Sequence, residues 1–333
     1  MGVALLMYLS RSGIINFGSL TRLLTAWPIT IAAFAILLLD VALMAVRLSL
    51  LFRPHDLSLP VRNALQLTLV GFFFSMFLPG AAGGDLPKVY YAAKGNNGRR
   101  TEVGTIVLLD RVIGLFSILL PPLLAAPFFT GLIRSVPALR DLLLLDGLLV
   151  GGMVLGGVLC MYSEVIRHFL SHGVLGWTPL KATVARVLDT VASYRRSTRT
   201  ILAALALSFI ANLSVIAVTG LAILALNPAE LRARMLLVVP MGHIVNSLPL
   251  TPGGIGVGET AFSALFHLAG IRGGAEALLC WRVWNAMIGL LGLAVYVAGI
   301  KRSVFNRRKN AESEAQPESA LIQAPGEATG EFV

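Results

Sequence analysis

Two Pro-Gly breaks, each ending in a carboxylate, are the features of the sequence that point most directly to chemistry. The first break reads PGAAGGD and ends at Asp85, and the second reads TPGGIGVGE and ends at Glu259. Each break follows an apolar run. Each is also followed by an arginine at a similar distance, because Arg111 lies 26 residues after Asp85 and Arg282 lies 23 residues after Glu259. The pattern predicts a weak internal repeat.

The breaks would free backbone N–H and C=O groups that lipid cannot satisfy, so these groups must face protein or a watery cavity. A half-helix that starts after a break presents free N–H groups and a positive dipole end, which suit an anion such as a phosphate headgroup. Paired breaks in two halves of a chain indicate a binding site near the bilayer midplane. Simple surface loops, with Asp85 and Glu259 as helix caps, are the alternative. The break residues are Pro79, Gly80, Gly84, Pro252, Gly253, Gly254 and Gly256.

Four ionisable residues near the breaks are the candidate substrate-binding residues: Asp85, Arg111, Glu259 and Arg282. A charge at the bilayer centre costs about 2.5 to 3.5 kcal/mol on insertion scales, so such residues pair in the interior or serve a pathway. Two arrangements are open. The four residues can form two acid–base pairs, one per half. They can also line one cavity, with arginines holding phosphate and carboxylates holding an amine.

Other polar residues within apolar runs have expected structural roles. Arg47 and Arg53 lie near the end of a run and are expected to extend their charged groups to the membrane interface. Asp110 directly precedes Arg111 in an apolar stretch and is expected to face the protein interior. Four more side chains are expected to form hydrogen bonds between helices: Asn212, His243, Asn246 and Asn285.

The composition predicts an all-α polytopic membrane protein. Of the 333 residues, 56% are hydrophobic and only 13% are charged, with a mean hydropathy of +0.80. These values exclude a disordered chain, a coiled coil and an ordinary soluble enzyme. The length allows about seven or eight apolar helices. The two broken segments are expected to be either crossings or re-entrant half-helices, in a weak inverted repeat.

The apolar runs define a membrane domain over residues 27–300. Residues 1–26 are expected to be an N-terminal stump and connector, and residues 301–333 a basic stop and a disordered acidic cytoplasmic tail. Residues 177–199 predict an amphipathic helix at the membrane interface, because one apolar stripe includes Val184, Leu188 and Val191. The apolar runs are 27–52, 60–78, 103–129, 142–162, 201–226, 235–250, 256–271 and 275–300.

Basic residues cluster in three connectors, 88–100, 168–199 and 301–309. By the positive-inside rule all three are cytoplasmic, which places the C-terminus in the cytoplasm of a multi-pass inner (plasma) membrane protein. The net charge of +10 also favours contact with lipids that carry phosphate headgroups, and short basic loops between spans do not indicate nucleic acid.

The sequence offers no catalytic constellation, no cofactor motif and no metal-ligand spacing. Cys160 and Cys280 each lie in a long apolar run and are interpreted as small hydrophobic residues. We therefore expect no catalytic residues, no metal and no cofactor.

Several segments resemble the integral membrane domain of lysylphosphatidylglycerol synthases, which also occurs as free-standing proteins. These segments are FLPGAAGGDLPKVYYAAKG, TIVLLDRVIGL, SLPLTPGGIGVGETAFSALFHLAGI and CWRVWNAMIGLLG. In two-domain members the membrane region translocates the aminoacylated lipid that a separate soluble domain makes, and relatives are linked to polyprenol-linked sugar pathways. The matching positions are Pro79, Gly80, Gly84, Asp85, Arg111, Pro252, Gly253, Gly254, Gly256, Glu259 and Arg282.

The chain departs from the family pattern in three places. The soluble aminoacyl-transfer domain is absent from this sequence, so the resemblance does not imply lysyl-lipid synthesis. The acidic residue before the first-half arginine is the short Asp110. The family usually begins with a full span, whereas Gly2 to Leu9 is a stump, which indicates either a lost span or an upstream start.

Three functions fit the sequence. The leading hypothesis is a flippase-like translocase or carrier for a phospholipid or a polyprenyl-linked lipid. The first alternative is a membrane-embedded transferase that acts on a lipid-linked substrate, with Asp85 or Glu259 as general base. The second alternative is a non-catalytic membrane subunit for a partner lipid-modifying enzyme.

Overall fold

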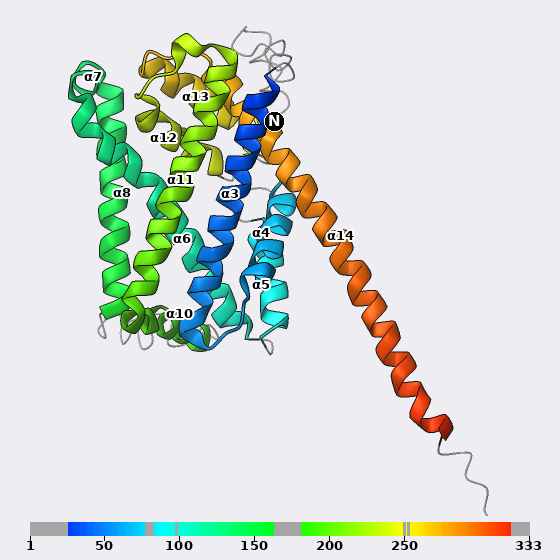
Figure 1. Ribbon diagram of the computed structural model, residues 1–333. Helices are drawn as coiled ribbons and strands as arrows, with labels where there is room; N and C mark the ends of the chain where they lie inside the picture. The colour runs from blue at the N-terminus through cyan, green and yellow to red at the C-terminus, as the bar shows by residue number, and fades with distance from the viewer. Residues whose placement is uncertain are drawn as a thin grey trace, which may run out of the picture.

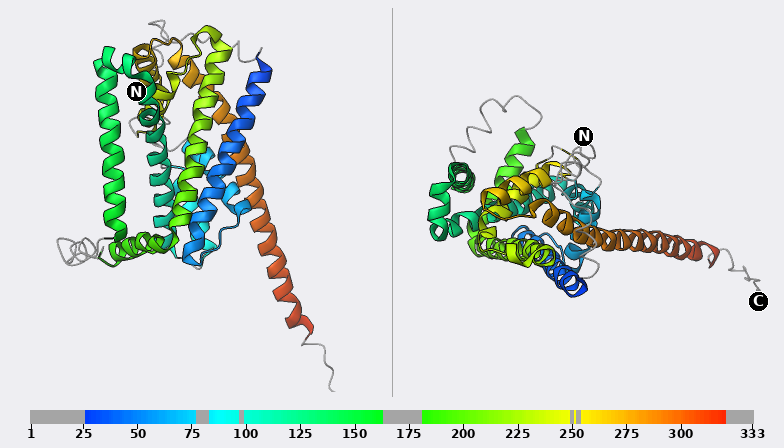
Figure 2. Two further views of the ribbon diagram at one scale, coloured as in Figure 1. Left: turned by 60° about the vertical axis from the view of Figure 1, so that its left-hand side comes forward. Right: turned by 90° about the horizontal axis from the view of Figure 1, so that it is seen from above.

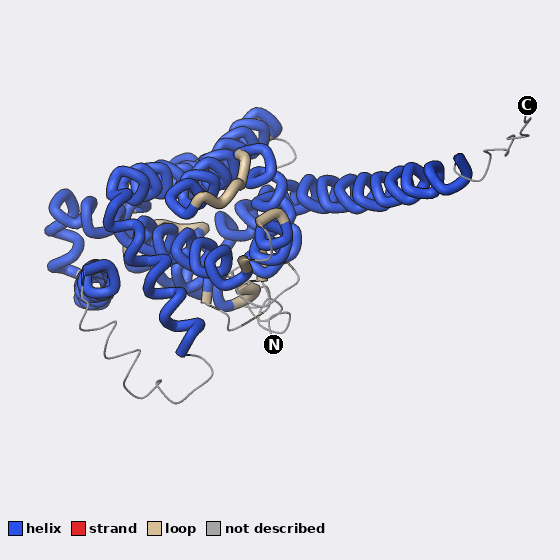
Figure 3. Tube along the Cα trace, turned by 90° about the horizontal axis from the view of Figure 1, so that it is seen from below, coloured by secondary structure: helices blue, strands red, loops and turns tan. Residues whose placement is uncertain are grey.

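The computed structural model describes residues 26–76, 83–96, 99–162, 181–248, 251 and 254–320. Within these ranges every regular element is a helix (Figure 3), so the predicted all-α class is confirmed. Five described helices are long and apolar enough to cross a membrane, as expected of a polytopic membrane protein. They are α3 (Trp27–Phe52), α6 (Arg100–Ala125), α8 (Pro137–Tyr162), α11 (Thr198–Leu226) and the N-terminal half of α14 (Gly274–Ala320).

The long helices run between two faces of the bundle (Figure 1). We call the face where α7 (Thr130–Ser135) lies the upper face, and the face where α10 (Lys181–Ser193) lies the lower face. Helices α3, α8 and α14 run downward, and α6 and α11 run upward. Short 3-10 turns adjoin the helix ends: η1 (Arg53–His55), η2 (Ala126–Phe129), η3 (Tyr194–Ser197) and η4 (Pro228–Glu230).

The first broken segment is a re-entrant pair, α4 (Val61–Ser75) and α5 (Asp85–Lys94). With 15 and 10 residues they are about 22 and 15 Å long, shorter than the hydrocarbon core of about 30 Å. The ends of the pair are tied together, because the Ser58 N–H donates to Asn96 Oδ1 at 2.9 Å and Asn96 Nδ2 donates to the Ser58 carbonyl at 3.2 Å. The pair therefore enters and leaves by the lower face, and the run 60–78 is not a complete crossing.

The second broken segment is a re-entrant pair from the opposite side, α12 (Met235–Ser247) and α13 (Val257–Leu268). Its ends are also tied, because Arg234 Nη1 donates to the Ala269 carbonyl at 3.1 Å. Both ends lie at the upper face (Figure 1). The order long helix, re-entrant pair, long helix thus occurs twice with opposite orientation, which confirms the predicted inverted repeat.

Close helix contacts hold the first re-entrant pair against α14. A Cβ added to Gly292 of α14 would collide with the Leu69 carbonyl of α4, and a Cβ added to Gly289 would collide with the Met76 sulfur. Small residues allow this approach of backbones in a membrane bundle. In contrast, α8 lies at the edge of the bundle (Figure 2) and is the least buried of the five long helices.

The described parts of the three basic connectors lie toward one face. The end of α5 and the start of α6 lie at the lower face, α10 lies along it, and the C-terminal part of α14 extends beyond it (Figures 1 and 2). In helix α10, Leu188 is buried and Arg186 and Asp189 are exposed, and residues 177–180 of the expected interfacial helix lie outside the described residues. Which face is cytoplasmic stays a prediction, and the expected stump at residues 1–26 lies, except for Ala26, outside the described residues.

Two expectations about the charged segments need correction. Lys88 is not part of a connecting loop, because α5 is helical from Asp85 and carries Lys88 on its first turn. The chain beyond Lys301 is helical as far as Ala320 rather than disordered throughout. Alanine and the straight-chain Glu, Gln, Lys and Arg residues of this stretch favour helix, which explains why α14 continues beyond the bundle (Figure 3).

Candidate functional site

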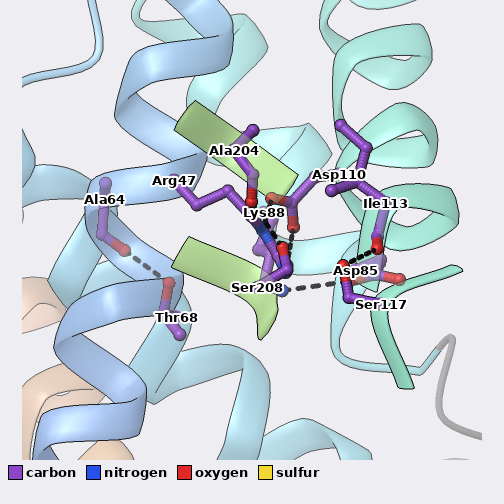
Figure 4. Close-up of polar contacts among 10 residues, drawn as sticks. All are labelled: Arg47, Ala64, Thr68, Asp85, Lys88, Asp110, Ile113, Ser117, Ala204 and Ser208. Carbon is purple, nitrogen blue, oxygen red and sulfur yellow. Dashed lines mark hydrogen bonds and ion pairs between the residues drawn. The ribbon is translucent and has the colours of Figure 1, made fainter. Parts of the chain in front are cut away.

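Asp85 lies at the start of α5, where α4 and α5 meet. The two helices can approach there because a Cβ added to Gly84 would collide with the Gly71 carbonyl. Asp85 Oδ2 accepts a hydrogen bond from Arg111 Nη1 at 2.8 Å. Asp85 Oδ1 accepts a hydrogen bond from Lys88 Nζ at 3.1 Å (Figure 4). A carboxylate in the first turn is also favoured by the helix dipole. Asp85 therefore bridges two cations, one on its own helix and one on α6.

Glu259 occupies the matching position in the second re-entrant pair, in the first turn of α13. Its Oε2 accepts a hydrogen bond from the Gly256 N–H at 2.6 Å, and its Oε1 accepts one from Arg282 Nε at 2.7 Å. The loop before α13 needs glycine, because Gly254 and Gly256 have φ values of 69° and 86°. Glu259 thus caps α13 and ties it to α14.

Arg282 holds the second break in place from α14. Besides Glu259, its Nη2 donates to Asn246 Oδ1 at 2.7 Å and to the Gly254 carbonyl at 2.9 Å. Gly258 permits this arrangement, since a Cβ there would collide with Asn246 Oδ1. One guanidinium therefore connects α12, the break, α13 and α14, and satisfies backbone and side-chain oxygens that the break leaves without helix partners.

Both predicted acid–base pairs are thus present, one in each half, but they differ in exposure. The side chains of Asp85 and Arg111 are 22% and 26% exposed, whereas those of Glu259 and Arg282 are 0% and 19% exposed. The first pair is accessible and shares its carboxylate with Lys88. The second pair is closed around Glu259.

A cavity of about 620 Å³ lies where the two re-entrant pairs meet. Helices α3, α4, α5, α12 and α14 and the second break contribute its lining. Of the four predicted site residues, Asp85 and Arg282 line it, and Arg111 and Glu259 support them from behind. The rest of the wall is largely apolar, including Phe72, Met76, Ile255, Trp281 and Val283.

Arg47 does not extend to the membrane interface, contrary to expectation. It is buried and forms a two-pronged ion pair with Asp110, with Nε–Oδ1 at 2.6 Å and Nη2–Oδ2 at 2.9 Å, and its Nη1 donates to Ser208 Oγ at 2.8 Å (Figure 4). Arg47 lies near the end of α3, but its side chain stays in the interior because the Asp110 carboxylate of α6 pairs with its buried donors. This cluster joins α3, α6 and α11.

Of the residues expected to form hydrogen bonds between helices, three have contacts that differ in kind. Asn246 does so through Arg282. Asn285 instead donates from Nδ2 to the Trp281 carbonyl of its own helix at 3.0 Å. His243 packs edge-on against Phe262 and Trp281, and its Nε2 has no hydrogen-bond partner within the described structure. Asn285 thus pairs its amide within its own helix, and His243 takes part in aromatic packing between helices instead of a hydrogen bond.

Comparison with known sequences agrees with this architecture. The family described as "Lysylphosphatidylglycerol synthase TM region" matches residues 2–295, nearly the whole chain. The chain belongs to this family. No curated protein and no solved structure matches the chain.

Membership of the lysylphosphatidylglycerol synthase TM region family confirms the resemblance inferred from the breaks. The match covers both re-entrant pairs and both carboxylate–arginine pairs. Of the break residues, Gly84, Gly254 and Gly256 are described, whereas Pro79, Gly80, Pro252 and Gly253 lie outside the described residues.

Sequence reasoning missed one charged residue of this family member's cavity, Lys88. Lys88 belongs to the basic cluster 88–100, which the positive-inside rule predicts to be a cytoplasmic connector. Its spacing of three residues from Asp85 was the available signal, since residues i and i+3 are neighbours on a helix. This spacing is informative only if a helix is expected to begin at Asp85, as α5 does.

Proposed function

We propose that this protein binds a lipid with a phosphate headgroup in the cavity between its re-entrant pairs and translocates it across the membrane. The observation that carries the proposal is the position of the cavity. It is lined by α4 and α5 of the first pair and by α12 and the break of the second pair, which enter from opposite faces, so a headgroup held there is near the midpoint of a path from one face to the other.

The chemistry of the wall supports an amphipathic ligand. Asp85, Lys88 and Arg282 provide charge, Asn246 and Ser75 provide neutral polar groups, and much of the remaining lining is apolar. Ligand pockets of this kind use a few polar groups to orient an otherwise apolar ligand. A phospholipid or a polyprenyl-linked lipid has both parts.

The basic segments at the lower face support a plasma-membrane orientation with that face and the C-terminus in the cytoplasm. A lipid-modifying enzyme that acts at the same membrane is the partner class that fits this role. Such an enzyme would supply or consume the lipid that the cavity carries.

Reconstituted vesicles test the proposal. The full chain is placed in liposomes that contain a fluorescent phospholipid, and a membrane-impermeant reductant reports how fast the label exchanges between leaflets. Asp85→Asn combined with Arg111→Gln should slow exchange at least about tenfold, the effect of losing charge-assisted contacts. The matched control is Arg140→Gln with Asp141→Asn, an ion pair whose side chains are 61% and 64% exposed.

Two outcomes would overturn the proposal. One is exchange by the wild-type chain no faster than in protein-free vesicles. The other is unchanged exchange in both the Asp85/Arg111 variant and a Glu259→Gln, Arg282→Ala variant that still elutes as folded protein in gel filtration.

A further inference from the structure

The charged residues of the cavity wall differ in how many of their hydrogen-bonding groups are already used within the protein. Among the described lining residues, Asp85, Lys88 and Arg282 are charged, with histidine neutral. The stretches that complete the two breaks, 77–82, 249–250 and 252–253, contain no ionisable side chain in the sequence. The wall therefore has one acid and two bases, a net positive charge.

Arg282 has few donors left for a ligand. Its Nε and Nη2 already donate to Glu259, Asn246 and the Gly254 carbonyl, and it has a further interaction within the protein. A guanidinium has five N–H donors in a fixed fork, so these bonds fix its plane. Releasing them for a headgroup would leave oxygens of the break unsatisfied.

The carboxylates are also engaged. Glu259 has no exposed side-chain surface, and each of its oxygens accepts a hydrogen bond. Each oxygen of Asp85 faces a cation, Arg111 on one side and Lys88 on the other. A ligand amine would have to compete with both cations for Asp85, in a wall that is already positive.

Lys88 is the cation with donors to spare. Its ammonium has three N–H donors, and within the described structure its hydrogen-bond partner is Asp85 Oδ1, at the longer distance of 3.1 Å. Asp85 retains Arg111 at 2.8 Å if Lys88 turns to another anion. The Lys88 stem passes Gly71, where a Cβ would lie 2.9 Å from its Cε, so the backbone of α4 leaves room for the ammonium at the wall.

We propose that Lys88 is the phosphate-binding residue of the cavity, and that the cavity selects lipids with a net negative headgroup over lipids with a cationic, aminoacylated headgroup. This inference rests on the proposed lipid-binding function. It names the substrate class by charge, and it assigns Arg282 to holding the second break rather than to gripping phosphate.

Translocation of three lipids tests the charge preference. The full chain is reconstituted in phosphatidylcholine vesicles with a trace of acyl-labelled phosphatidylglycerol, phosphatidylcholine or lysyl-phosphatidylglycerol. Wild type should translocate phosphatidylglycerol fastest and the lysyl ester slowest. Lys88→Ala should slow phosphatidylglycerol by about ten- to hundredfold, the range for one charge-assisted hydrogen bond, and should slow phosphatidylcholine less, because the choline cation already offsets its phosphate. Lys88→Arg should restore the preference, and Lys88→Glu should reverse it.

Lys94→Ala is the matched control, since Lys94 is an exposed lysine on the same helix and should have no effect on preference. Equal or faster movement of the lysyl ester in wild type would overturn the inference while leaving translocation intact. An unchanged preference in Lys88→Ala would do the same. Inorganic phosphate is then added as a competitor. If it inhibits phosphatidylglycerol movement as strongly as an equal concentration of unlabelled phosphatidylglycerol does, Lys88 binds a free anion and the lipid assignment is overturned.

A binding measurement separates this inference from the translocation proposal. Native mass spectrometry of the purified chain, titrated with the same three lipids, counts bound lipids without any transport. Preferential binding of phosphatidylglycerol that is lost in Lys88→Ala and kept in Lys94→Ala would support the inference even if no lipid crosses the vesicles. Equal binding of all three lipids would overturn it.

Discussion

Arg47 and Asp110 lie 63 positions apart in the sequence and form a buried, two-pronged ion pair that joins α3 to α6. Removing one partner leaves the other as an uncompensated buried charge, which costs about 3–5 kcal/mol. We expect Arg47→Leu or Asp110→Leu to lower the free energy of unfolding by this amount. Denaturant unfolding in detergent micelles provides the measurement.

The double variant Arg47→Leu, Asp110→Leu is the control for this prediction, because it removes both charges together. It should be more stable than either single variant. Single variants as stable as the wild type would show that the pair does not stabilise the fold.

Gly254 should not tolerate a side chain. Its φ of 69° lies in the left-handed region, where an L-residue costs about 1–2 kcal/mol, and a Cβ would also collide with the Asn246 carbonyl. We expect Gly254→Ala to lower the melting temperature in detergent. Gly157→Ala is the matched control, because Gly157 is helical and has open space around its Cα. Equal melting temperatures for the two variants would contradict the described break.

Asn96 should stabilise the base of the first re-entrant pair. Its side chain bonds the Ser58 N–H and carbonyl and the Ala92 carbonyl, and each buried group left unpaired costs about 1–3 kcal/mol. We expect Asn96→Ala to increase proteolysis of the chain between α4 and α6 in detergent. Lys94→Ala, an exposed neighbour, should not change the cleavage rate. An Asn96→Ala protein that is cleaved no faster than the wild type would argue against a stabilising role for the Asn96–Ser58 hydrogen bonds.

Membrane orientation can be read by cysteine labelling. In a background with Cys160→Ala and Cys280→Ala, we introduce Phe128→Cys at the upper face or Arg196→Cys at the lower face, both at exposed positions. An impermeant maleimide should label Phe128→Cys on intact cells and Arg196→Cys only after permeabilisation, because basic connectors stay in the cytoplasm. The reverse pattern would invert the orientation and leave the fold unchanged.

Local pattern was enough to predict much of the architecture. The apolar run ending at Phe52 predicts a helix because its length and hydropathy suit a membrane span. The carboxylates Asp85 and Glu259 were predicted to matter because each follows a break that frees backbone groups. Their arginine partners were identified by parallel spacing in the two halves, and the structure contains both pairs.

The sequence by itself determined the apolar helices, the two breaks and the four charged residues beside them, since these depend on neighbouring residues and on the apolar surroundings that apolar runs require. Only the tertiary structure decided that both breaks turn back, that Arg47 meets Asp110, and that Arg282 holds Asn246 and the Gly254 carbonyl as well as Glu259. These outcomes depend on which oxygens from distant parts of the chain lie within hydrogen-bond distance of a given donor after the helices have packed. The partners of a buried charge are set by which helices lie close together. Close glycine contacts, such as Gly71 with Gly84, permit such packing, and the local sequence around a charged residue does not specify it.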